Sequence, residues 1–207
     1  GLGWVGKHTL LIHPRVGSYL LLGGVLTTME LAENEEAVAD RCGTCTRCID
    51  ACPTGAITPY SVDATRCISY LTIERREAIA EEFHGPIGDW MFGCDVCQEV
   101  CPHNSARGEG WEGARVLAEY SPRRAGFDVM EVLGWTEEDR RGAFSGSSMK
   151  RATLAMMKRN AIIVAGNVAG RDPRVLQLLA QVVADTGEPE MVRGTARAVL
   201  ARLGRGG

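Results

Sequence analysis

The stretch Cys42-Gly-Thr-Cys45-Thr-Arg-Cys48-Ile-Asp-Ala-Cys52-Pro53 contains four of the eight cysteines of this 207-residue chain. Its spacing, C-x2-C-x2-C-x3-C-P, lets three thiolates on one short loop bind three iron corners of a [4Fe–4S] cubane. A local loop does not easily reach the fourth corner, and in two-cluster proteins the cysteine before the proline binds the other cluster. The spacing therefore predicts one cluster on this loop and a second cluster that receives Cys52.

A second cysteine segment, Cys94-Asp-Val-Cys97-Gln-Glu-Val-Cys101-Pro102, has the C-x2-C pair and the final C-P but lacks one cysteine. Cys67 stands alone between the two segments. If Cys101 crosses to the first cluster and Cys67 replaces the missing ligand, all eight thiolates are used. The predicted ligands are Cys42, Cys45, Cys48 and Cys101 for cluster 1, and Cys52, Cys67, Cys94 and Cys97 for cluster 2.

Other roles stay open for these cysteines. Disulfides are typical of small secreted proteins, but four cysteines within eleven residues are poor structural staples. Zinc prefers C-x2-C pairs separated by a longer gap, which a C-x2-C-x2-C run fits poorly. Cys67 alone also has the alternative of a buried free cysteine. Metal ligation in a reducing compartment is the interpretation that fits the clustering.

Charge is distributed unevenly along the chain. Residues 140–207 carry 12 Lys and Arg against 4 Asp and Glu, whereas the remaining residues carry 11 against 22. A basic C-terminal third indicates contact with a polyanion. A set of solvated helix faces is the alternative explanation.

The N-terminal region, residues 1–33, is expected to form strands and turns, with apolar runs at Leu10–Ile12, Tyr19–Leu22 and Val25–Thr28. The longest apolar stretch, Val16–Leu26, is shorter than the roughly 20 residues that span a bilayer. No secretory signal is visible, so we expect a cytoplasmic protein without membrane contact. Because the chain opens in an apolar, glycine-punctuated run at Gly1, we expect a fragment of a longer chain.

Helices are predicted in the middle and at the end of the chain. We expect an acidic helix over Glu33–Asp40 and a longer one over Asp63–Phe83, with Asp63 as its N-cap. Residues 103–139 have a mixed pattern that Trp111, Pro122 and Trp135 interrupt.

Three further helices are predicted after residue 140. The first is capped by Ser147 or Ser148 and runs through Val164. The third begins near Pro189 and ends at Gly204. Apolar residues at helical spacing predict the helix between them: Val175, Leu178, Leu179, Val182 and Val183.

A resemblance to a known family is carried by segments along nearly the whole chain. These are Gly1-Leu-Gly-Trp-Val-Gly-Lys-His-Thr-Leu-Leu-Ile-His-Pro14, Gly17-Ser-Tyr19, Cys42–Ile57, Cys67-Ile-Ser-Tyr-Leu-Thr-Ile-Glu74, Phe92–Asn104, Ser147–Asn167 and Pro189–Leu203. With them the chain resembles the epoxyqueuosine reductases, cobalamin- and iron–sulfur-dependent enzymes that complete queuosine synthesis on tRNA. The Cys67 and Cys94 segments are the most specific, because generic ferredoxins lack them.

The resemblance implies an oxidoreductase in which the two clusters pass electrons from an external donor to cobalamin. The reduced cofactor would then act on the epoxide of the tRNA-bound nucleoside. It implies an α+β fold in several parts. These are the C-terminal remnant of an α/β cobalamin-binding domain (1–33), a ferredoxin-like domain with two [4Fe–4S] clusters (34–110), a connecting segment (111–139) and a HEAT-like helical domain (140–207).

The resemblance also implies contact residues. Those implied for cobalamin are Ile12, Gly17, Ser18, Tyr19, Gly23, Ser69, Asp95 and Val96. Those implied for the tRNA anticodon stem-loop are Lys150, Arg151, Lys158, Arg159 and Arg193. The family's proton-donating aspartate lies upstream of Gly1, so we name no general acid and expect this segment to be inactive alone.

Three histidines are not expected to be metal ligands. His8 and His13 are predicted to be turn or surface residues, and His103 a packing residue able to tune a cluster by hydrogen bonding.

Two alternative functions compete with the reductase. They are a reductive dehalogenase-like enzyme and a ferredoxin-like electron carrier. Because no long exposed apolar stripe is evident, we expect a monomer.

Overall fold

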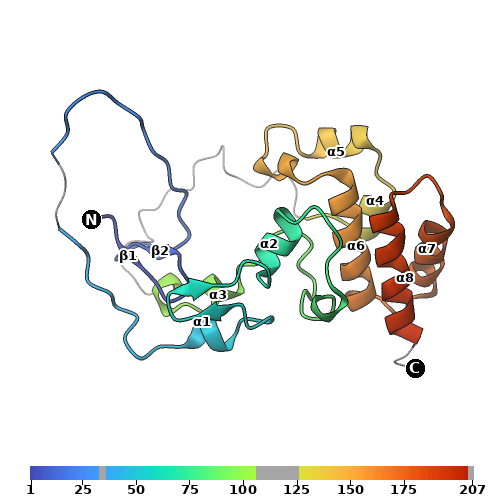
Figure 1. Ribbon diagram of the computed structural model, residues 1–207, viewed down its shortest axis with the longest axis horizontal. Coiled ribbons are helices and arrows are strands. Elements are labelled where there is room, and N and C mark those ends of the chain that lie inside the picture. Colours follow the sequence, from blue (N-terminus) through green and yellow to red (C-terminus); the bar gives the residue numbers. More distant parts are fainter. Residues whose placement is uncertain (33–35, 106–125, 205–207) are drawn as a thin grey trace. The chain divides into compact units, whose positions relative to one another are not determined.

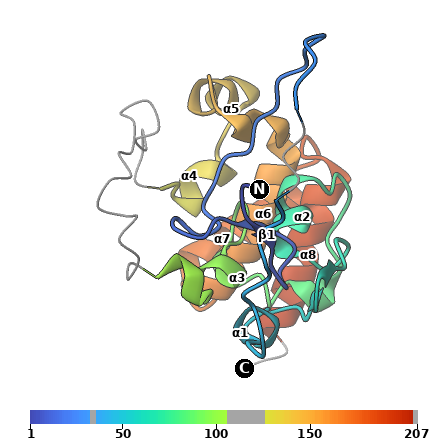
Figure 2. The same ribbon diagram turned by 90° about the vertical axis from the view of Figure 1, so that its left-hand side faces the viewer.

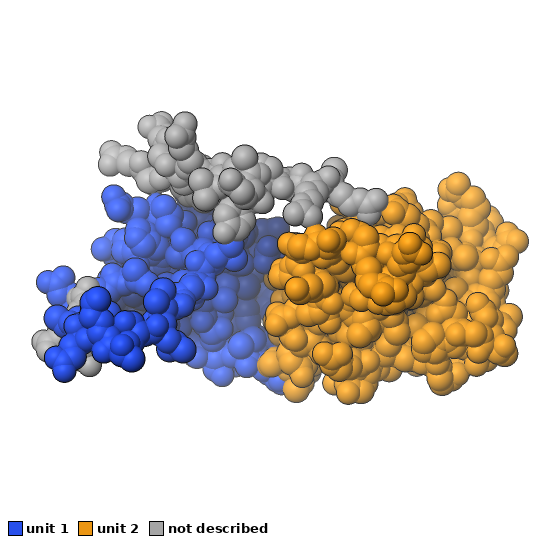
Figure 3. All heavy atoms as spheres, turned by 90° about the horizontal axis from the view of Figure 1, so that it is seen from above, with its two compact units in different colours: residues 1–63, 95–121 blue, residues 64–94, 122–207 orange. Residues whose placement is uncertain are grey.

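The computed structural model of the chain describes residues 1–32, 36–105 and 126–204. It contains two compact units, drawn in blue and orange in Figure 3. Unit 1 comprises Gly1–Asp63 and Asp95–Ser121, and unit 2 comprises Ala64–Cys94 and Pro122–Gly207. Each unit is described by itself below.

Unit 1 consists of short antiparallel ribbons and single-turn helices joined by irregular chain (Figure 1). Its elements are β1 (Trp4–Val5), β2 (Leu11–Ile12), α1 (Arg47–Asp50), β3 (Ile57–Thr58), β4 (Ser61–Val62), α3 (Val96–Glu99) and the 3-10 turn η2 (Pro102–Asn104). β1 pairs with β2, and β3 pairs with β4. Helices α1 and α3, which each carry a cysteine, pack against each other.

The β1–β2 ribbon brings the N-terminal region beside the cysteines. Trp4 pairs with Ile12 across the ribbon, and both side chains are buried. They form a small apolar cluster with Cys101, against which Val38 and Cys42 pack. The two sequence segments of unit 1 therefore meet in its core.

Two sequence-based expectations for unit 1 are wrong. The runs Tyr19–Leu22 and Val25–Thr28 form no strand, and Leu26 and Val25 are fully or almost fully exposed. A strand needs a partner for its backbone groups, and the described residues supply none here. Of the acidic helix predicted over Glu33–Asp40, residues 33–35 lie outside the described part and residues 36–40 are not helical.

Unit 2 is a group of helices with a large apolar core. Its elements are α2 (Ile68–Ile73), η1 (Glu81–Phe83), α4 (Val129–Leu133), α5 (Glu137–Ala143), η5 (Ser148–Arg151), α6 (Leu154–Val168), α7 (Pro173–Ala184) and α8 (Glu190–Gly204). Helix α6 packs against α4 and α8, and α7 packs against α8 (Figures 1 and 2). Residues on all sides of α6 are buried, as expected of a central helix.

Local caps fix where these helices begin. Thr153 accepts a hydrogen bond from the Met156 N–H and starts α6, whereas the predicted cap Ser147 instead accepts from Met149 and starts η5. Asp172 caps α7, whose first residue is Pro173. The second and third predicted helices are confirmed as α7 and α8, while the first begins six residues later than Ser148.

The predicted helix over Asp63–Phe83 is mostly wrong. Only α2 is α-helical there, and it begins after Cys67 rather than Asp63. The rest of the segment Ala64–Cys94 is largely irregular and is hydrogen-bonded by α6, which is why it belongs to unit 2. This division differs from the predicted domain 34–110. Trp111 and Pro122, expected to punctuate the connecting segment 111–139, lie outside the described residues.

Across residues 1–32, 36–105 and 126–204, no helix has both the length and the apolar character needed to cross a bilayer.

Candidate iron–sulfur site

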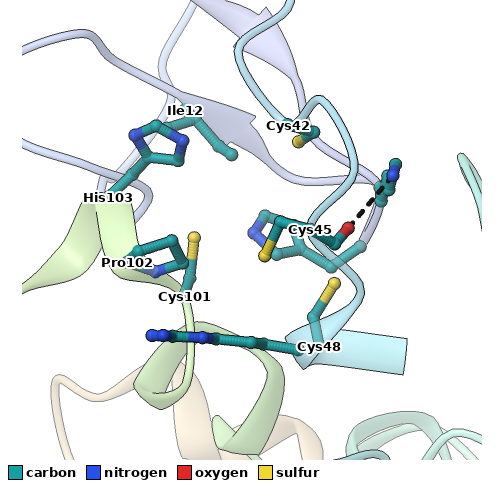
Figure 4. A pocket seen from close by; sticks show the side chains of 10 residues that line it. Ile12, Cys42, Cys45, Cys48, Cys101, Pro102 and His103 are labelled. Atoms are coloured by element: carbon teal, nitrogen blue, oxygen red, sulfur yellow. Dashed lines mark hydrogen bonds between the residues drawn. The ribbon is translucent and has the colours of Figure 1, made fainter. Parts of the chain in front are cut away.

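Four cysteines line one cavity of unit 1 (Figure 4). Cys42, Cys45 and Cys48 come from the first cysteine segment, and Cys101 comes from the second. Their sulfur atoms face the same space, and none of the four forms a disulfide. The structure thus brings together the set that the spacing assigns to cluster 1.

The first cysteine loop is shaped by local turns and by one lysine. The Cys45 N–H donates to the Cys42 carbonyl at 3.0 Å, and Gly43 between them has φ +51°, a conformation that favours glycine. The Lys7 ammonium donates to the carbonyls of Gly43 and Cys45 at 2.6 and 3.0 Å; the second bond is the dashed line in Figure 4. Lys7 therefore fixes the backbone of the loop that carries the thiols.

The loop carrying Cys101 is held by a hydrogen-bond network to the N-terminal region. The Asn104 side chain accepts from the Ser18 N–H at 2.6 Å and donates to the Ser18 hydroxyl and the Gln98 carbonyl, both at 2.8 Å. Gly17 fits closely here, since an added Cβ would lie 2.0 Å from the Asn104 Oδ1. The network positions the chain on both sides of Cys101.

Burial shapes the acid–base chemistry of these thiols. It raises the pKa of Cys48 and of Cys101 above the usual value for a thiol. Burial alone would also raise the pKa of Cys52, but hydrogen bonds from Ala56 and Thr54 outweigh it and lower that pKa. Because iron binds thiolates, cluster assembly releases the protons of these groups.

The arrangement of donors fits a cubane better than a single ion. Among the residues that the structure describes, no three His, Cys, Asp or Glu side chains converge closely enough to hold one metal ion. A [4Fe–4S] cluster needs a different geometry, because each thiolate binds its own iron corner. Four thiols spread around one cavity supply such a set.

The predicted ligands of cluster 2 are divided between the units. Cys52 and Cys97 belong to unit 1, and Cys67 and Cys94 to unit 2. Cys67 is the N-cap residue of α2. Near the other end of α2, the Thr72 hydroxyl accepts from the N–H of Gly93, the residue before Cys94, at 3.0 Å. Helix α2 therefore ties the two cysteines of unit 2 to one scaffold, and the pairing of all four stays a prediction.

The residues predicted to contact cobalamin are in contrasting environments. Ile12 is fully buried and lines the cysteine cavity, and Gly17 and Ser18 are buried against Asn104. Ser69 and Val96 are half-buried. The exposed members of the set are Tyr19, Gly23 and Asp95.

The five basic residues predicted to contact tRNA fall into two groups that differ in exposure. Lys150 and Arg151 are exposed and line a shallow hollow in unit 2 together with Arg140 and Arg141. Arg151 pairs with Glu74 at 2.9 Å while staying exposed, and the other three are engaged more deeply within unit 2.

Lys158, Arg159 and Arg193 do not present free charges. Lys158 is buried in an ion pair with Glu188. Arg159 is fully buried, and its guanidinium donates to three backbone carbonyls. The half-buried Arg193 donates to the Val183 carbonyl at 3.2 Å. The predicted phosphate contact of Arg159 is therefore corrected, because helical periodicity does not reveal which basic side chains face backbone carbonyls. The contacts predicted for Lys158 and Arg193 stay predictions.

Two features of the site were not predicted from sequence. Lys7 had no predicted role, and His8 lies in a turn, as expected, but its burial at the cavity was not foreseen. His8 is buried, lines the cysteine cavity, and has a lowered pKa caused mainly by burial. His103, expected to pack and to lie near a cluster, lines the cavity and makes an edge-to-face contact with Trp4. The sequence gives no signal for the role of Lys7 or for the burial of His8, since Gly43 and the cysteines of the cavity lie more than thirty residues away.

Comparison with known proteins adds a family assignment for the cysteine region. The family described as a 4Fe-4S double cluster binding domain matches residues 41–104. All eight cysteines of the chain lie within that match. Binding of iron–sulfur clusters is therefore supported by the family as well as by the geometry.

Relatives extend the likeness beyond the cysteines. An epoxyqueuosine reductase of Pseudomonas aeruginosa is 38% identical over 208 residues, covering 99% of this chain and 55% of the relative. One of Leadbetterella byssophila is 43% identical over 168 residues, covering 79% of this chain and 52% of the relative. The chain thus resembles the epoxyqueuosine reductases. It spans about half the length of the curated relatives that it matches.

Solved structures agree with this resemblance. The epoxyqueuosine reductase of Bacillus subtilis superposes with a TM-score of 0.74 at 26% identity, covering 98% of this chain and 53% of that protein. An epoxyqueuosine reductase solved with an epoxyqueuosine-modified tRNA stem loop gives a TM-score of 0.77 at 28% identity, covering 99% and 52%. The resemblance predicted from sequence is confirmed, together with a helix-rich α+β fold that includes a 4Fe-4S binding domain.

Proposed function

We propose that this chain is the iron–sulfur and helical part of an enzyme that reduces epoxyqueuosine in tRNA to queuosine. One observation carries the proposal: the likeness to epoxyqueuosine reductases runs through both units and includes the segment in which all eight cysteines lie. A dehalogenase-like enzyme or a simple electron carrier is not favoured, because the relatives described above are all named epoxyqueuosine reductase.

The clusters would supply single electrons, and the chain would hold their ligands. Cluster 1 is assigned to the four cysteines that line one cavity of unit 1. Cluster 2 is assigned by the crossing rule to the other four, namely Cys52, Cys67, Cys94 and Cys97. Burial of Cys48 and Cys101 would keep water from cluster 1.

Cobalamin is proposed as the electron acceptor on the strength of the resemblance. The residues present fit it only in part. Ile12, Gly17 and Ser18 are committed to packing and hydrogen bonds within unit 1, so they do not fit a direct role. Tyr19 and Asp95 are exposed and stay candidates for contact, as does Gly23. Because the fit is incomplete, no chemical step is assigned through the cofactor or to a general acid of this chain.

The tRNA is proposed to contact the basic hollow of unit 2. Lys150 and Arg151 are exposed at its rim, and Arg141 is exposed beside them. Arg140 forms the inner wall, where it donates to the carbonyls of Lys150 and Ala152 at 3.2 and 3.1 Å. Positive charges held on a fixed backbone suit phosphate contacts, which position an RNA without reading its sequence.

The remaining assignments rest on the resemblance and on the sequence. They are an external electron donor, a cytoplasmic monomer, an N-terminal remnant of a cobalamin-binding domain, and a HEAT-like arrangement of the C-terminal helices. The packing of α8 against both α6 and α7 supports the last of these.

Queuosine formation tests the proposed function. The full-length protein is reduced anaerobically with cobalamin and tRNA carrying epoxyqueuosine, and the digested tRNA is searched for queuosine by mass spectrometry. Queuosine that forms only when cobalamin and the clusters are present is the expected result. Absence of queuosine from protein that holds both clusters and cobalamin would overturn the proposed reaction.

Iron analysis tests the cluster assignment separately. We expect about eight iron atoms per chain, from two cubanes. Cys67→Ser should lower this to about four and leave one cluster signal in electron paramagnetic resonance (EPR) spectra. Loss of both clusters, or of neither, would contradict the proposed pairing.

Charge reversal tests the tRNA surface. Lys150→Glu combined with Arg151→Glu should weaken binding of the anticodon stem-loop at least about tenfold and reduce its salt dependence, because two phosphate contacts become repulsive. Arg174→Glu is the matched control, because Arg174 is also exposed in unit 2 but lies outside the hollow. Equal losses of affinity in the two proteins would argue against a specific surface.

A further inference from the structure

The buried imidazole of His8 lies at the cavity of cluster 1. Only 4% of the His8 surface is exposed, and the residue lines the same cavity as Cys42, Cys45, Cys48 and Cys101. The β1–β2 ribbon places it there, since His8 lies in the turn between the two strands.

A local hydrogen bond fixes the tautomer of His8. The Leu10 N–H donates to His8 Nδ1 at 3.2 Å. A nitrogen that accepts a hydrogen bond carries no proton, so the ring is neutral and its proton is on Nε2. The His8 Nε2 is therefore a hydrogen-bond donor.

This donor has no acceptor among the described residues. Nε2 of His8 is fully buried and makes no hydrogen bond there. Buried polar groups are almost always satisfied, so an orphaned donor indicates a missing partner. Trp4 Nε1 is also orphaned in unit 1, but Trp4 does not line this cavity. The acceptors that a loaded cavity would offer to His8 are the sulfur atoms of the cluster and its thiolates.

We propose that His8 donates a hydrogen bond from Nε2 to a sulfur of cluster 1 and thereby raises the reduction potential of that cluster. The inference rests on the proposed binding of a cluster by the four cysteines. Reduction adds a negative charge to the cluster, so a donor to its sulfur stabilises the reduced state more than the oxidised state. His8 would in this way favour the residence of the electron on cluster 1.

A purely structural role for His8 predicts something different. In that case only Nδ1 matters, because it closes the turn at Leu10. Two substitutions separate the roles. His8→Asn keeps an acceptor near the position of Nδ1 but has no group that reaches the position of Nε2. His8→Gln gives up the turn acceptor but can place an amide N–H at the cavity.

The experiment is an EPR-monitored redox titration of the full-length protein, after its iron content has been measured. His8→Asn should keep all the iron and lower one of the two reduction potentials. The expected change is about tenfold in the equilibrium constant for reduction, which is about 59 mV for one electron. His8→Gln should recover most of this change. Electron–nuclear double resonance should show an exchangeable proton coupling that His8→Asn loses.

Three results would overturn the inference. Unchanged potentials in fully loaded His8→Asn would show that Nε2 does not act on the cluster. A larger shift in His8→Gln than in His8→Asn would assign the effect to the turn, because only His8→Asn keeps an acceptor for the Leu10 N–H. A parent protein without iron would overturn the proposed cluster binding itself, and the inference with it; the initial iron measurement distinguishes that case.

Discussion

The two units hold their cysteines by different means. In unit 1 the loop carrying Cys42, Cys45 and Cys48 is shaped mainly by backbone turns within a few residues. In unit 2 the segment 64–94, which begins near Cys67 and ends at Cys94, has little regular structure of its own. It is held instead by side chains of α6 that lie some seventy to ninety residues later in the chain.

The anchors on α6 are three polar residues, of which Arg159 and Asn160 are buried and Asn167 is half-buried. Arg159 donates to the carbonyls of Leu71, Arg75 and Glu77. The other two anchors, Asn160 and Asn167, lie two turns apart on α6. Asn160 donates to the carbonyls of Thr72 and Met91 at 2.8 and 2.9 Å, and Asn167 to those of His84 and Gly88 at 2.7 and 2.8 Å.

A local motif and a distant scaffold can therefore both hold cluster ligands in position. A dense cysteine motif needs little help from the rest of the fold, because adjacent ligands bind the same cluster. A ligand that stands alone in the sequence, such as Cys67, needs its backbone fixed from outside, and buried donors can do this because each carbonyl they satisfy would otherwise be costly.

Removal of iron should have the largest effect and should separate the behaviour of the two units most clearly. Anaerobic chelation is expected to abolish amide-exchange protection in residues 36–63 and 95–105 while α6, α7 and α8 keep theirs. The reason is the size of the cores: unit 1 has the small cluster around Trp4 and Ile12, whereas unit 2 has a large apolar core. Hydrogen exchange with mass spectrometry measures this, and reloading iron is the control. Equal loss in both units would refute the contrast.

Arg159→Met should have the next largest effect. It leaves three backbone carbonyls without their donor, and we expect unit 2 to lose about 3–5 kcal/mol of its free energy of unfolding. Burial lowers the pKa of Arg159 to about 10, so the side chain is still charged at neutral pH. Denaturant titration followed by circular dichroism measures the change.

The iron content of the Arg159→Met protein shows which cluster depends on this anchor. Because Leu71 and Arg75 flank the end of the α2 scaffold, cluster 2 should be lost while cluster 1 is kept, lowering iron to about half. Arg174→Met is the control, because that side chain is 85% exposed. Loss of cluster 1 alone would contradict the assignment of Arg159 to the segment 64–94.

Gly17→Ala should have a moderate effect confined to unit 1. Gly17 has φ +72°, which costs other residues about 1–2 kcal/mol, and the added methyl group would also displace Asn104. We expect cluster 1 to be lost at a lower temperature, as seen from its visible absorbance. Gly55→Ala is the matched control, since Gly55 has φ +58° with open space around it. An effect no larger than that of Gly55→Ala would show that the Asn104 contact is unimportant.

Arg151→Ala should have the smallest effect on stability. Arg151 pairs with Glu74 at 2.9 Å, but the two side chains are 60% and 45% exposed. Exposed pairs contribute roughly 0–1 kcal/mol, and salt weakens them further. Thermal melts at low and high salt measure the change. A loss above about 2 kcal/mol would mean that this ion pair, rather than the α6 anchors, holds the segment 64–94.

Prediction from sequence succeeded where the signal was local. The amphipathic pattern around Val175 and Val182 located α7, and Pro189 marked the start of α8. It failed at the runs Tyr19–Leu22 and Val25–Thr28, where apolar character alone suggested strands. It also failed over Asp63–Phe83, where carbonyls that follow α2, those of Arg75 and Glu77, accept from Arg159 of α6 instead of from a helix of their own.

Sequence alone is enough to predict the chemistry of the site, because ligand spacing on one short loop limits what metal centre it can hold. Tertiary structure was needed to bring Cys101 to that loop, to bury His8 with an unused donor, and to turn Arg159 from a supposed RNA contact into an internal anchor. The reason is physical: a periodic pattern shows which residues share a face of a helix, but it does not show which distant backbone groups that face will meet.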